Sequence, residues 1–337
     1  MHSNHQSDDA SLTIPAALRR MGLLGPGETA RFSALTGGVS SDIHLVETAS
    51  RRFCVKRALA RLKVAAVWEA PTNRNAAEAA WIRQIGQWLP DGVPALLGED
   101  EQLGLFAMAF LAPELNPVWK EHLLEQRVDS AFAARVGADL GLIHAASARE
   151  GELALRFAND TTFGPIRIEP YLMATARAHP DLAGRIEAIA ARTLASKKAL
   201  IHGDVSPKNI LCGRKGPVFL DAECACFGDP AFDLAFCLNH LLLKGARRGV
   251  PRAAYRDAFE ALAGTYFARI DWEDRAALEA RTAALLPVLF LARVDGKSPV
   301  EYLTQEDERE AVRHFARPLI ADPQQDLIAI ANAWARQ

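Results

Sequence analysis

Apolar and polar positions follow two different patterns along the chain, and the pattern changes near residue 112. Upstream, short apolar runs typical of strands surround one helical stretch, which extends from Asn75 to about Leu89. The strand-like runs are Phe32–Leu35, Ile43–Thr48, Arg52–Lys56 and Leu105–Phe110. Downstream the pattern is mostly helical, and its clearest helix extends from about Val128 to His144, where apolar residues recur every three or four positions. The sequence therefore predicts an α+β protein, with a small β-rich part before a larger helical part.

The chain is long enough for two lobes, because its 337 residues exceed the usual size of one compact core. The two prolines of Ala112–Pro117 make this segment a natural connector. We expect a disordered tail over residues 1–12, an N-lobe over residues 13–111 and a C-lobe over residues 112–337. Clefts between lobes are favoured ligand sites, so we expect the functional site there.

Composition favours a soluble globular protein. Half of the residues are apolar, about a quarter are charged, and the formal net charge is −2, which argues against a generally basic surface for nucleic acid. No apolar run approaches the roughly 20 residues that span a bilayer. The most apolar segments, Ala231–Leu243 and Ala283–Ala292, are predicted to be buried helices. The polar N-terminus lacks the apolar core of a secretory signal, which favours a cytoplasmic location.

The five cysteines do not suggest a disulfide framework, because their number is odd and they are scattered through a long chain. Cys224 and Cys226 would point to the same face of a strand. A metal or redox pair is one interpretation, but no second Cys/His pair lies nearby to complete a zinc site. Reduced, packed thiols in a cytoplasmic protein are the preferred interpretation.

The candidate chemistry lies between His202 and Asp221. Two short apolar runs flank Gly213–Gly216, which predicts a β-hairpin with a four-residue loop. If Cys212 pairs with Pro217, Asn209 lies opposite Leu220 and within one residue of Asp221. A carboxamide and a carboxylate would then lie close together, and both are hard oxygen ligands suited to Mg²⁺ with nucleotide phosphates.

A third oxygen group precedes this hairpin. Asp204 lies five residues before Asn209, in the loop that leads into the first strand. A carboxylate in that position could accept a proton from a substrate hydroxyl. Phosphoryl transfer needs these parts: a metal across the phosphates and a carboxylate that orients the attacking hydroxyl.

The ordered motif His-Gly-Asp-x-x-x-x-Asn, followed by Asp-x-Glu, resembles the aminoglycoside phosphotransferase and choline kinase superfamily, in particular its methylthioribose-kinase-like bacterial members. The resemblance implies a bilobal protein-kinase-like fold with a nucleotide cleft, ATP and Mg²⁺ as cofactors, and a small-molecule hydroxyl as acceptor. It makes Asp204 the catalytic base and Asn209 and Asp221 magnesium ligands. Glu223 would help to hold a second ion or a water on one.

The segment after the motif matches the same superfamily. Asp229 is a natural N-cap, with Pro230 at the first helical position. The resemblance implies that Asp233 braces the catalytic loop from inside. It gives His202 a similar role, in which the ring orients the loop without taking part in the chemistry.

On the nucleotide side, Lys56 ends a predicted strand and resembles the phosphate-binding lysine of the kinase N-lobe. Glu78, on the helix that follows, is its candidate partner; the alternative is that both are solvated surface charges. Gly37, Gly38 and Ser40 lie in a loop between two predicted strands, where backbone N–H groups could bind a phosphate.

The acceptor side is the least determined. Arg293 follows an apolar helix and resembles an arginine that lies near the acceptor and phosphates in the methylthioribose-kinase-like group; an ordinary surface loop is the alternative. Aminoglycoside-modifying relatives typically have an acidic C-terminus, whereas this chain ends in ANAWARQ. A sugar or polyol hydroxyl is therefore preferred over an aminoglycoside-like compound, and the sequence leaves open a monomer or a homodimer.

Two other functions compete with a small-molecule kinase. A nucleotide-binding regulatory pseudokinase would have lost the base, the metal ligand or the lysine, and Asp204, Asp221 and Lys56 are all present. A protein kinase is disfavoured because the chain has His-Gly-Asp in place of His-Arg-Asp and lacks both Asp-Phe-Gly and a long activation segment.

Overall fold

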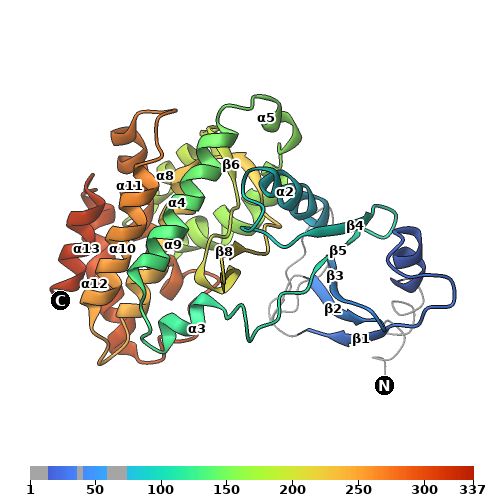
Figure 1. The fold of residues 1–337 in the computed structure, drawn as a ribbon. Helices are drawn as coiled ribbons and strands as arrows, with labels where there is room; N and C mark the ends of the chain where they lie inside the picture. The colour runs from blue at the N-terminus through green and yellow to red at the C-terminus, as the bar shows by residue number, and fades with distance from the viewer. Residues whose placement is uncertain (1–13, 36–40, 59–73) are drawn as a thin grey trace, which may run out of the picture. The chain divides into compact units, whose positions relative to one another are not determined.

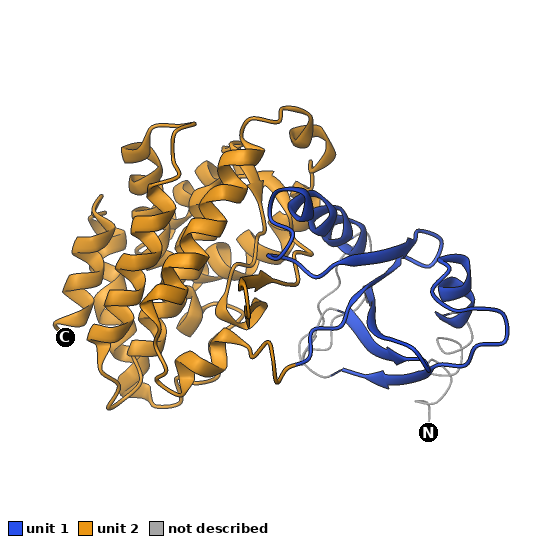
Figure 2. Ribbon diagram, viewed as in Figure 1, with its two compact units in different colours: residues 1–112 blue, residues 113–337 orange. Residues whose placement is uncertain are grey.

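The structure, a computed structural model, describes residues 14–35, 41–58 and 74–337. The chain forms two compact units, Met1–Ala112 and Pro113–Gln337, coloured separately in Figure 2. The tail expected over residues 1–12 and the candidate phosphate-binding residues Gly37, Gly38 and Ser40 lie outside the described residues.

The N-terminal unit contains a five-stranded antiparallel sheet in the order β1-β2-β3-β5-β4 (Figure 1). Its elements are β1 (Arg31–Ala34), β2 (Ser41–Glu47), β3 (Arg52–Ala58), α2 (Arg74–Trp88), β4 (Leu96–Asp100) and β5 (Leu105–Ala109). The four strands and the helix expected here are present. The fifth strand, β4, was not predicted, because this edge strand is short, polar at its end and exposed at Leu97. A helical segment at residues 14–20 contributes Leu18 to the apolar core against Val55 and Leu105.

The C-terminal unit is mainly helical. Its helices are α3 (Trp119–Leu124), α4 (Ser130–Ser147), α5 (Glu152–Arg156), α6 (Asp160–Phe163), the π-helix η1 (Gly164–Met173), α7 (Ala174–Ala178), α8 (Ala183–Ala195), the 3₁₀ turn η2 (Pro207–Asn209), α9 (Pro230–Gly245), α10 (Arg252–Phe267), α11 (Arg275–Asp295), α12 (Glu306–Ala321) and α13 (Leu327–Ala335). Helix α9 is buried along its whole length and packs against α10 and α11. The two apolar segments expected to form buried helices lie in α9 and α11. Within the described ranges, no helix is long and apolar enough to cross a membrane.

Two small antiparallel ribbons carry the motif residues. One joins β6 (Ala199–Ile201) to β9 (Cys226–Gly228), and the other joins β7 (Ile210–Gly213) to β8 (Gly216–Phe219). Cys212 pairs with Pro217, so the predicted register of the hairpin is confirmed. The predicted four-residue loop is wrong: Gly213 and Gly216 still pair with each other, which leaves a two-residue turn at residues 214–215. Gly216 has φ of +144°, a conformation that favours glycine.

The cysteines are not a disulfide or metal framework in this fold. All five are free thiols, and Cys224 and Cys226 are fully buried. Burial raises the pKa of both thiols, which keeps them protonated and unreactive. The preferred interpretation of packed, reduced thiols agrees with this environment.

Candidate active site

The backbone of the loop between β6 and β7 is bound by Asp233 of α9. Its Oδ2 accepts a hydrogen bond from the backbone N–H of His202 at 2.7 Å, and its Oδ1 accepts one from Gly203 at 2.8 Å. Helix α9 begins where Asp229 caps it by accepting a bond from the N–H of Ala231. The bracing role expected for Asp233 and the N-cap expected at Asp229 are confirmed.

His202 ties this loop to the end of the neighbouring strand β8. Its Nδ1 accepts a bond from the N–H of Asp204 at 3.1 Å, so Nε2 carries the proton and donates to the carbonyl of Leu220 at 3.0 Å. Burial lowers the pKa of His202, which keeps the ring neutral. The ring therefore orients the loop, in agreement with the expected structural role.

The motif glycine is required by the backbone. Gly203 has φ of +78°, and a Cβ at this position would lie 2.8 Å from the carbonyl oxygen of Cys224. Both the conformation and the close approach exclude larger side chains. This turn places the next residue, Asp204, on the inner side of the loop.

Asp204 is 2 % exposed, and the basic side chains next to it contact one of its two carboxylate oxygens. Its Oδ2 lies 2.8 Å from Nη2 of Arg167 and 3.2 Å from Nζ of Lys208. Its Oδ1 is buried and has no hydrogen-bond partner among the described residues. Burial would raise the pKa of Asp204, but the charges of Arg167 and Lys208 outweigh it and hold the pKa below its ordinary value. The carboxylate is thus ionised at neutral pH, with one oxygen available to a substrate hydroxyl.

The hairpin brings Asn209 next to Asp221, as its register predicted. The N–H of Leu220 donates to the carbonyl of Asn209 at 2.9 Å, which places the two ends of the hairpin in contact. The Asn209 side chain donates from Nδ2 to the carbonyl of Asp204 at 3.1 Å, which fixes the orientation of the carboxamide. Asp221 has φ of +66°, a conformation uncommon for residues other than glycine and concentrated at functional sites.

These oxygen donors fit a magnesium ion that is shared with a nucleotide. Among the residues that the structure describes, no group of three or more His, Cys, Asp or Glu side chains could hold a metal unaided. Mg²⁺ usually takes only one or two carboxylates and completes its shell with phosphates and water. Asp221, with Asn209 and the buried carboxylate of Glu223 two residues further on, matches that smaller donor set.

In the N-terminal unit, Lys56 of β3 forms an ion pair with Glu78 of α2. Nζ of Lys56 lies 2.6 Å from Oε2 of Glu78, and both side chains are 2 % exposed. Asn75 adds a hydrogen bond to the carbonyl of Lys56 at 2.8 Å. The predicted pairing is confirmed, and the alternative that these are solvated surface charges is wrong.

The model of the phosphotransferase enzyme family (APH) matches residues 31–280, about three quarters of the chain. The chain belongs to this family. The match confirms the resemblance to the aminoglycoside phosphotransferase and choline kinase superfamily, and the finer likeness to methylthioribose-kinase-like members stays a prediction. No curated protein sequence matches the chain.

Solved structures show the fold of this phosphotransferase. A choline/ethanolamine kinase family protein from Mesorhizobium loti is 16% identical, with a TM-score of 0.52 over 96% of this chain and 99% of its own. Spectinomycin phosphotransferase, solved with ADP and spectinomycin, is 12% identical, with a TM-score of 0.53 over 96% of this chain and 98% of its own. Amicoumacin kinase, solved with AMP-PNP and Ca²⁺, is 13% identical, with a TM-score of 0.56 over 98% and 99%. The predicted protein-kinase-like α+β fold is confirmed.

Arg293, the acceptor-side candidate, lies in the last turn of α11 of the phosphotransferase. Its Nη1 donates to the hydroxyl of Tyr171 at 3.3 Å and to Oγ of Ser298 at 2.9 Å, and its guanidinium lies over the Tyr171 ring. The side chain is only partly exposed, which disagrees with the alternative that Arg293 lies in an ordinary surface loop.

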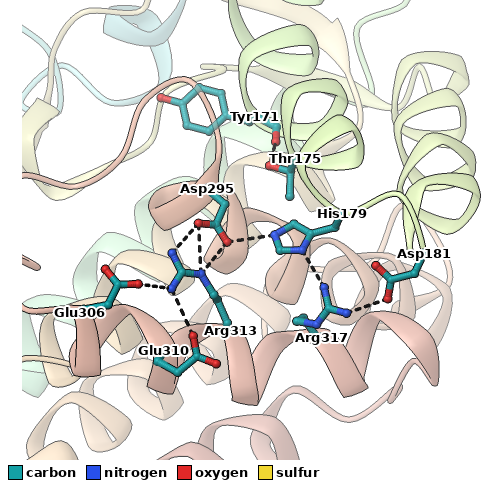
Figure 3. Close-up of polar contacts among 9 residues, drawn as sticks. All are labelled: Tyr171, Thr175, His179, Asp181, Asp295, Glu306, Glu310, Arg313 and Arg317. Carbon is teal, nitrogen blue, oxygen red and sulfur yellow. Dashed lines mark hydrogen bonds and ion pairs between the residues drawn. The ribbon is translucent and has the colours of Figure 1, made fainter.

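A network of ion pairs fixes the end of α11 beyond Arg293 (Figure 3). Asp295 accepts bonds from Arg313 of α12 at 2.8 to 3.2 Å and from Nε2 of His179 at 2.9 Å. Arg317 of α12 donates to the other ring nitrogen of His179 at 2.6 Å. The network therefore links the end of α11 to α12 and to the segment that follows η1.

Sequence reasoning missed Arg167 as a site residue. It lies in η1, is 5 % exposed, and donates from Nε to the carbonyl of Gly203 at 2.6 Å in addition to pairing with Asp204. The segment Phe163–Tyr171 carries more charged and turn residues than a plain core helix needs, which is the available signal in the sequence. Nothing in the pattern showed that a ten-residue π-helix would aim the guanidinium at the loop.

Proposed function

We propose that this phosphotransferase is an ATP-dependent small-molecule kinase that transfers the γ-phosphoryl group of ATP to a hydroxyl of its acceptor. The observation that carries the proposal is Asp204, an ionised and buried carboxylate with one oxygen held by Arg167 and the other without a partner in the described part of the chain. A group of this kind accepts a hydrogen bond from an attacking hydroxyl and holds it in line for transfer.

The reaction forms one bond and breaks another. The acceptor oxygen bonds to the γ-phosphorus while the bond from that phosphorus to the bridging oxygen breaks, and ADP leaves. Asp204 takes the hydroxyl proton and passes it to solvent. Because its pKa is below the ordinary value, Asp204 is a weak base, so its main contribution is to orient the hydroxyl in a loose transition state.

The remaining motif residues bind the nucleotide in this proposal. Mg²⁺ on Asn209, Asp221 and Glu223 would neutralise charge on the phosphates as the leaving group departs. Lys56, oriented by Glu78, would bind phosphate oxygens. Residues 13–111 thus serve phosphate binding, and residues 112–337 carry the catalytic loop and the acceptor site. A sugar or polyol hydroxyl is the preferred acceptor.

An ADP-release assay tests the function directly. The protein is incubated with MgATP and a panel of acceptors (methylthioribose, other sugars, aminoglycosides, choline and homoserine), with Asp204→Ala as the control. Release of ADP that needs both an acceptor and Asp204 supports the kinase. MgATP binding without any acceptor-dependent release contradicts the kinase and favours the regulatory pseudokinase. Acceptor-dependent release that survives in a folded Asp204→Ala variant contradicts the role proposed for Asp204.

A further inference from the structure

A group of cationic side chains lies near the proposed catalytic loop, on three elements of the C-terminal unit. The cationic cluster consists of Lys120 of α3, Lys244 of α9 and Arg293 of α11, with the side chains His240 and Tyr302 among them. Burial, followed by the charges of Lys244, Arg293, Lys208 and Lys120, lowers the pKa of His240 well below its ordinary value. The charges of four basic side chains therefore act on one buried ring.

Lys244 is the most unusual member, because it is 1 % exposed and forms no ion pair with a carboxylate in the part of the chain that the structure describes. Its Nζ donates to the backbone carbonyl of His240 at 3.4 Å and lies 5.1 Å from the centre of the Tyr302 ring. Within the described ranges, no acidic side chain forms an ion pair with it. Burying an unpaired ammonium is costly, and an apolar residue of similar length would make the fold more stable. Stability of the fold therefore does not account for Lys244.

The place of Lys244 in the last turn of α9 offers a simpler role, since a cation there interacts favourably with the helix dipole. That interaction would raise the pKa of the ammonium. Burial and the neighbouring charges of Lys120 and Arg293 instead lower the pKa of Lys244 to about 7. The surroundings disfavour the charge, so helix capping is an insufficient explanation.

Three buried polar atoms in the same cluster lack partners. His240 Nδ1, Arg293 Nε and the Tyr302 hydroxyl have no hydrogen-bond partner within the part of the chain that the structure describes. A buried polar group left without a hydrogen-bond partner destabilises a fold, because it has lost its bonds to water and gained none in return. The Arg293 and Tyr302 atoms are donors, and His240 Nδ1 is a donor in one tautomer. Donors and cations gathered in this way match an anion.

The cationic cluster is connected to Asp204 by two routes. Lys208, which acts on His240, also lies 3.2 Å from Oδ2 of Asp204. Arg293 donates to the hydroxyl of Tyr171, and Tyr171 lies in η1 together with Arg167, which pairs with Asp204. A single small molecule that presents its hydroxyl to Asp204 would therefore present its other end to the cations.

The nearby acid does not cancel this charge. Glu301 is paired with Lys120, and its side chain is 64 % exposed. Neither Lys244 nor Arg293 forms an ion pair with a carboxylate of the described residues. A choline or aminoglycoside cation placed against these side chains would meet like charges, which excludes such acceptors by repulsion.

We propose that the acceptor carries an anionic group, a carboxylate or a phosphate ester, in addition to the hydroxyl that is phosphorylated. Lys244 and Arg293 bind the anion, Lys120 strengthens the local field, and Asp204 holds the hydroxyl. The preferred acceptor is thus narrowed to a hydroxy acid or a sugar phosphate, provided that the kinase function proposed above is correct.

Matched acceptors test this class and separate its two forms. With MgATP, initial rates of ADP release are compared for glycerol, glycerate and glycerol 3-phosphate, and for glucose, gluconate and glucose 6-phosphate, with choline as the cation. We expect kcat/KM for an anionic member to exceed that of its neutral parent by about 10-fold or more, which is worth about 1.4 kcal/mol. Comparison of the two carboxylates with the two phosphate esters identifies which anionic group the acceptor carries. Faster phosphorylation of a neutral compound or of choline overturns the inference while leaving the kinase function intact.

A binding experiment keeps the inference testable if none of these compounds is phosphorylated. Thermal unfolding of the full chain is followed with saturating MgADP, which occupies the nucleotide phosphate site, and with inorganic phosphate or acetate at an ionic strength matched by sodium chloride. We expect one of the anions to raise the Tm of the wild type and of Lys197→Met, an exposed lysine paired with Asp160, but not of Lys244→Met. An equal rise in Lys244→Met, or no rise in the wild type with either anion, overturns the inference. Failure to bind MgADP would instead contradict the kinase function.

Discussion

Arg167 forms a buried ion pair with Asp204, with Nη2 2.8 Å from Oδ2 and both side chains less than 10 % exposed. The same guanidinium donates to the carbonyl of Gly203 and to its neighbour Ile166. It therefore fixes both the backbone and the carboxylate of the proposed catalytic loop. Since Arg167 is held in a π-helix, the geometry of η1 sets the position of the Asp204 carboxylate.

Replacing Arg167 by methionine should damage both stability and turnover. Removal of one partner from a buried pair leaves an uncompensated charge, so we expect a loss of about 3 to 5 kcal/mol in the free energy of unfolding. We expect kcat to fall at least about 10-fold, because the loop loses two hydrogen bonds that position Asp204. Urea unfolding and steady-state kinetics measure the two effects.

Arg177→Met is the matched control for this prediction. Arg177 lies 2.6 Å from Glu169, but the two side chains are 57 % and 40 % exposed, and an exposed pair contributes only about 0 to 1 kcal/mol. A stability loss in Arg167→Met no larger than that of the control would show that the Arg167 pair has no structural importance. Unchanged kcat would remove Arg167 from the active site.

Asp221→Asn should weaken the binding of magnesium nucleotide while leaving the fold intact. Asparagine tolerates the left-handed backbone at this position and keeps the shape of the side chain, but it removes the negative charge. We expect the affinity for MgADP to fall by at least about 10-fold. Mutation of residues that only hydrogen-bond to a metal ligand already lowers metal affinity by about that factor. Titration calorimetry with and without Mg²⁺ measures it. Equal affinity in the presence of Mg²⁺ would exclude Asp221 as a ligand.

The pair formed by Lys56 and Glu78 allows stability to be separated from nucleotide binding. Each single variant, Lys56→Met or Glu78→Leu, removes one partner from a buried ion pair and should cost about 3 to 5 kcal/mol in the free energy of unfolding. The double variant removes both charges and should recover most of that stability. It should nevertheless bind MgADP weakly, because the lysine that we propose to contact the phosphates is missing. A double variant with normal affinity would show that the pair is only structural.

The sequence predicted the local features that depend on short-range pattern. The register of the hairpin, the cap at Asp229 and the pairing of Lys56 with Glu78 follow from turn residues, capping chemistry and family motifs, and the structure contains all three. The length of the hairpin turn was wrong, because two glycines that looked like loop residues still pair as the last rung of the ladder.

The sequence did not predict contacts between distant segments. Arg167 reaches Asp204 across 37 positions, and the members of the cationic cluster come from helices far apart in the chain. An arginine in a charged segment has the same local pattern whether it faces solvent or a buried carboxylate. Only the packing of η1 and α11 against α9 and the loop distinguishes the two cases.

Lys244→Met should make the protein more stable, and the gain should depend on pH. The pKa of Lys244 falls from its ordinary 10.5 to about 7 on folding, so above pH 7 the unfolded chain binds a proton that the folded chain releases. The free energy of unfolding of the wild type therefore rises with pH through this group, at up to about 1.4 kcal/mol per pH unit, until the unfolded lysine also deprotonates. The methionine variant lacks this pH-dependent contribution to its free energy of unfolding.

The advantage of Lys244→Met should consequently shrink by about 2 kcal/mol between pH 7 and pH 9. The other titratable groups around Lys244 stay in one charge state over this range, because the pKa of Glu301 is lowered and burial raises the pKa values of Cys237 and Tyr302. Urea unfolding of both proteins at pH 7, 8 and 9 measures the difference, and Lys197→Met should track the wild type throughout. A constant difference would mean that Lys244 stays charged in the folded protein, whereas a less stable Lys244→Met variant would show that the buried ammonium supports the fold.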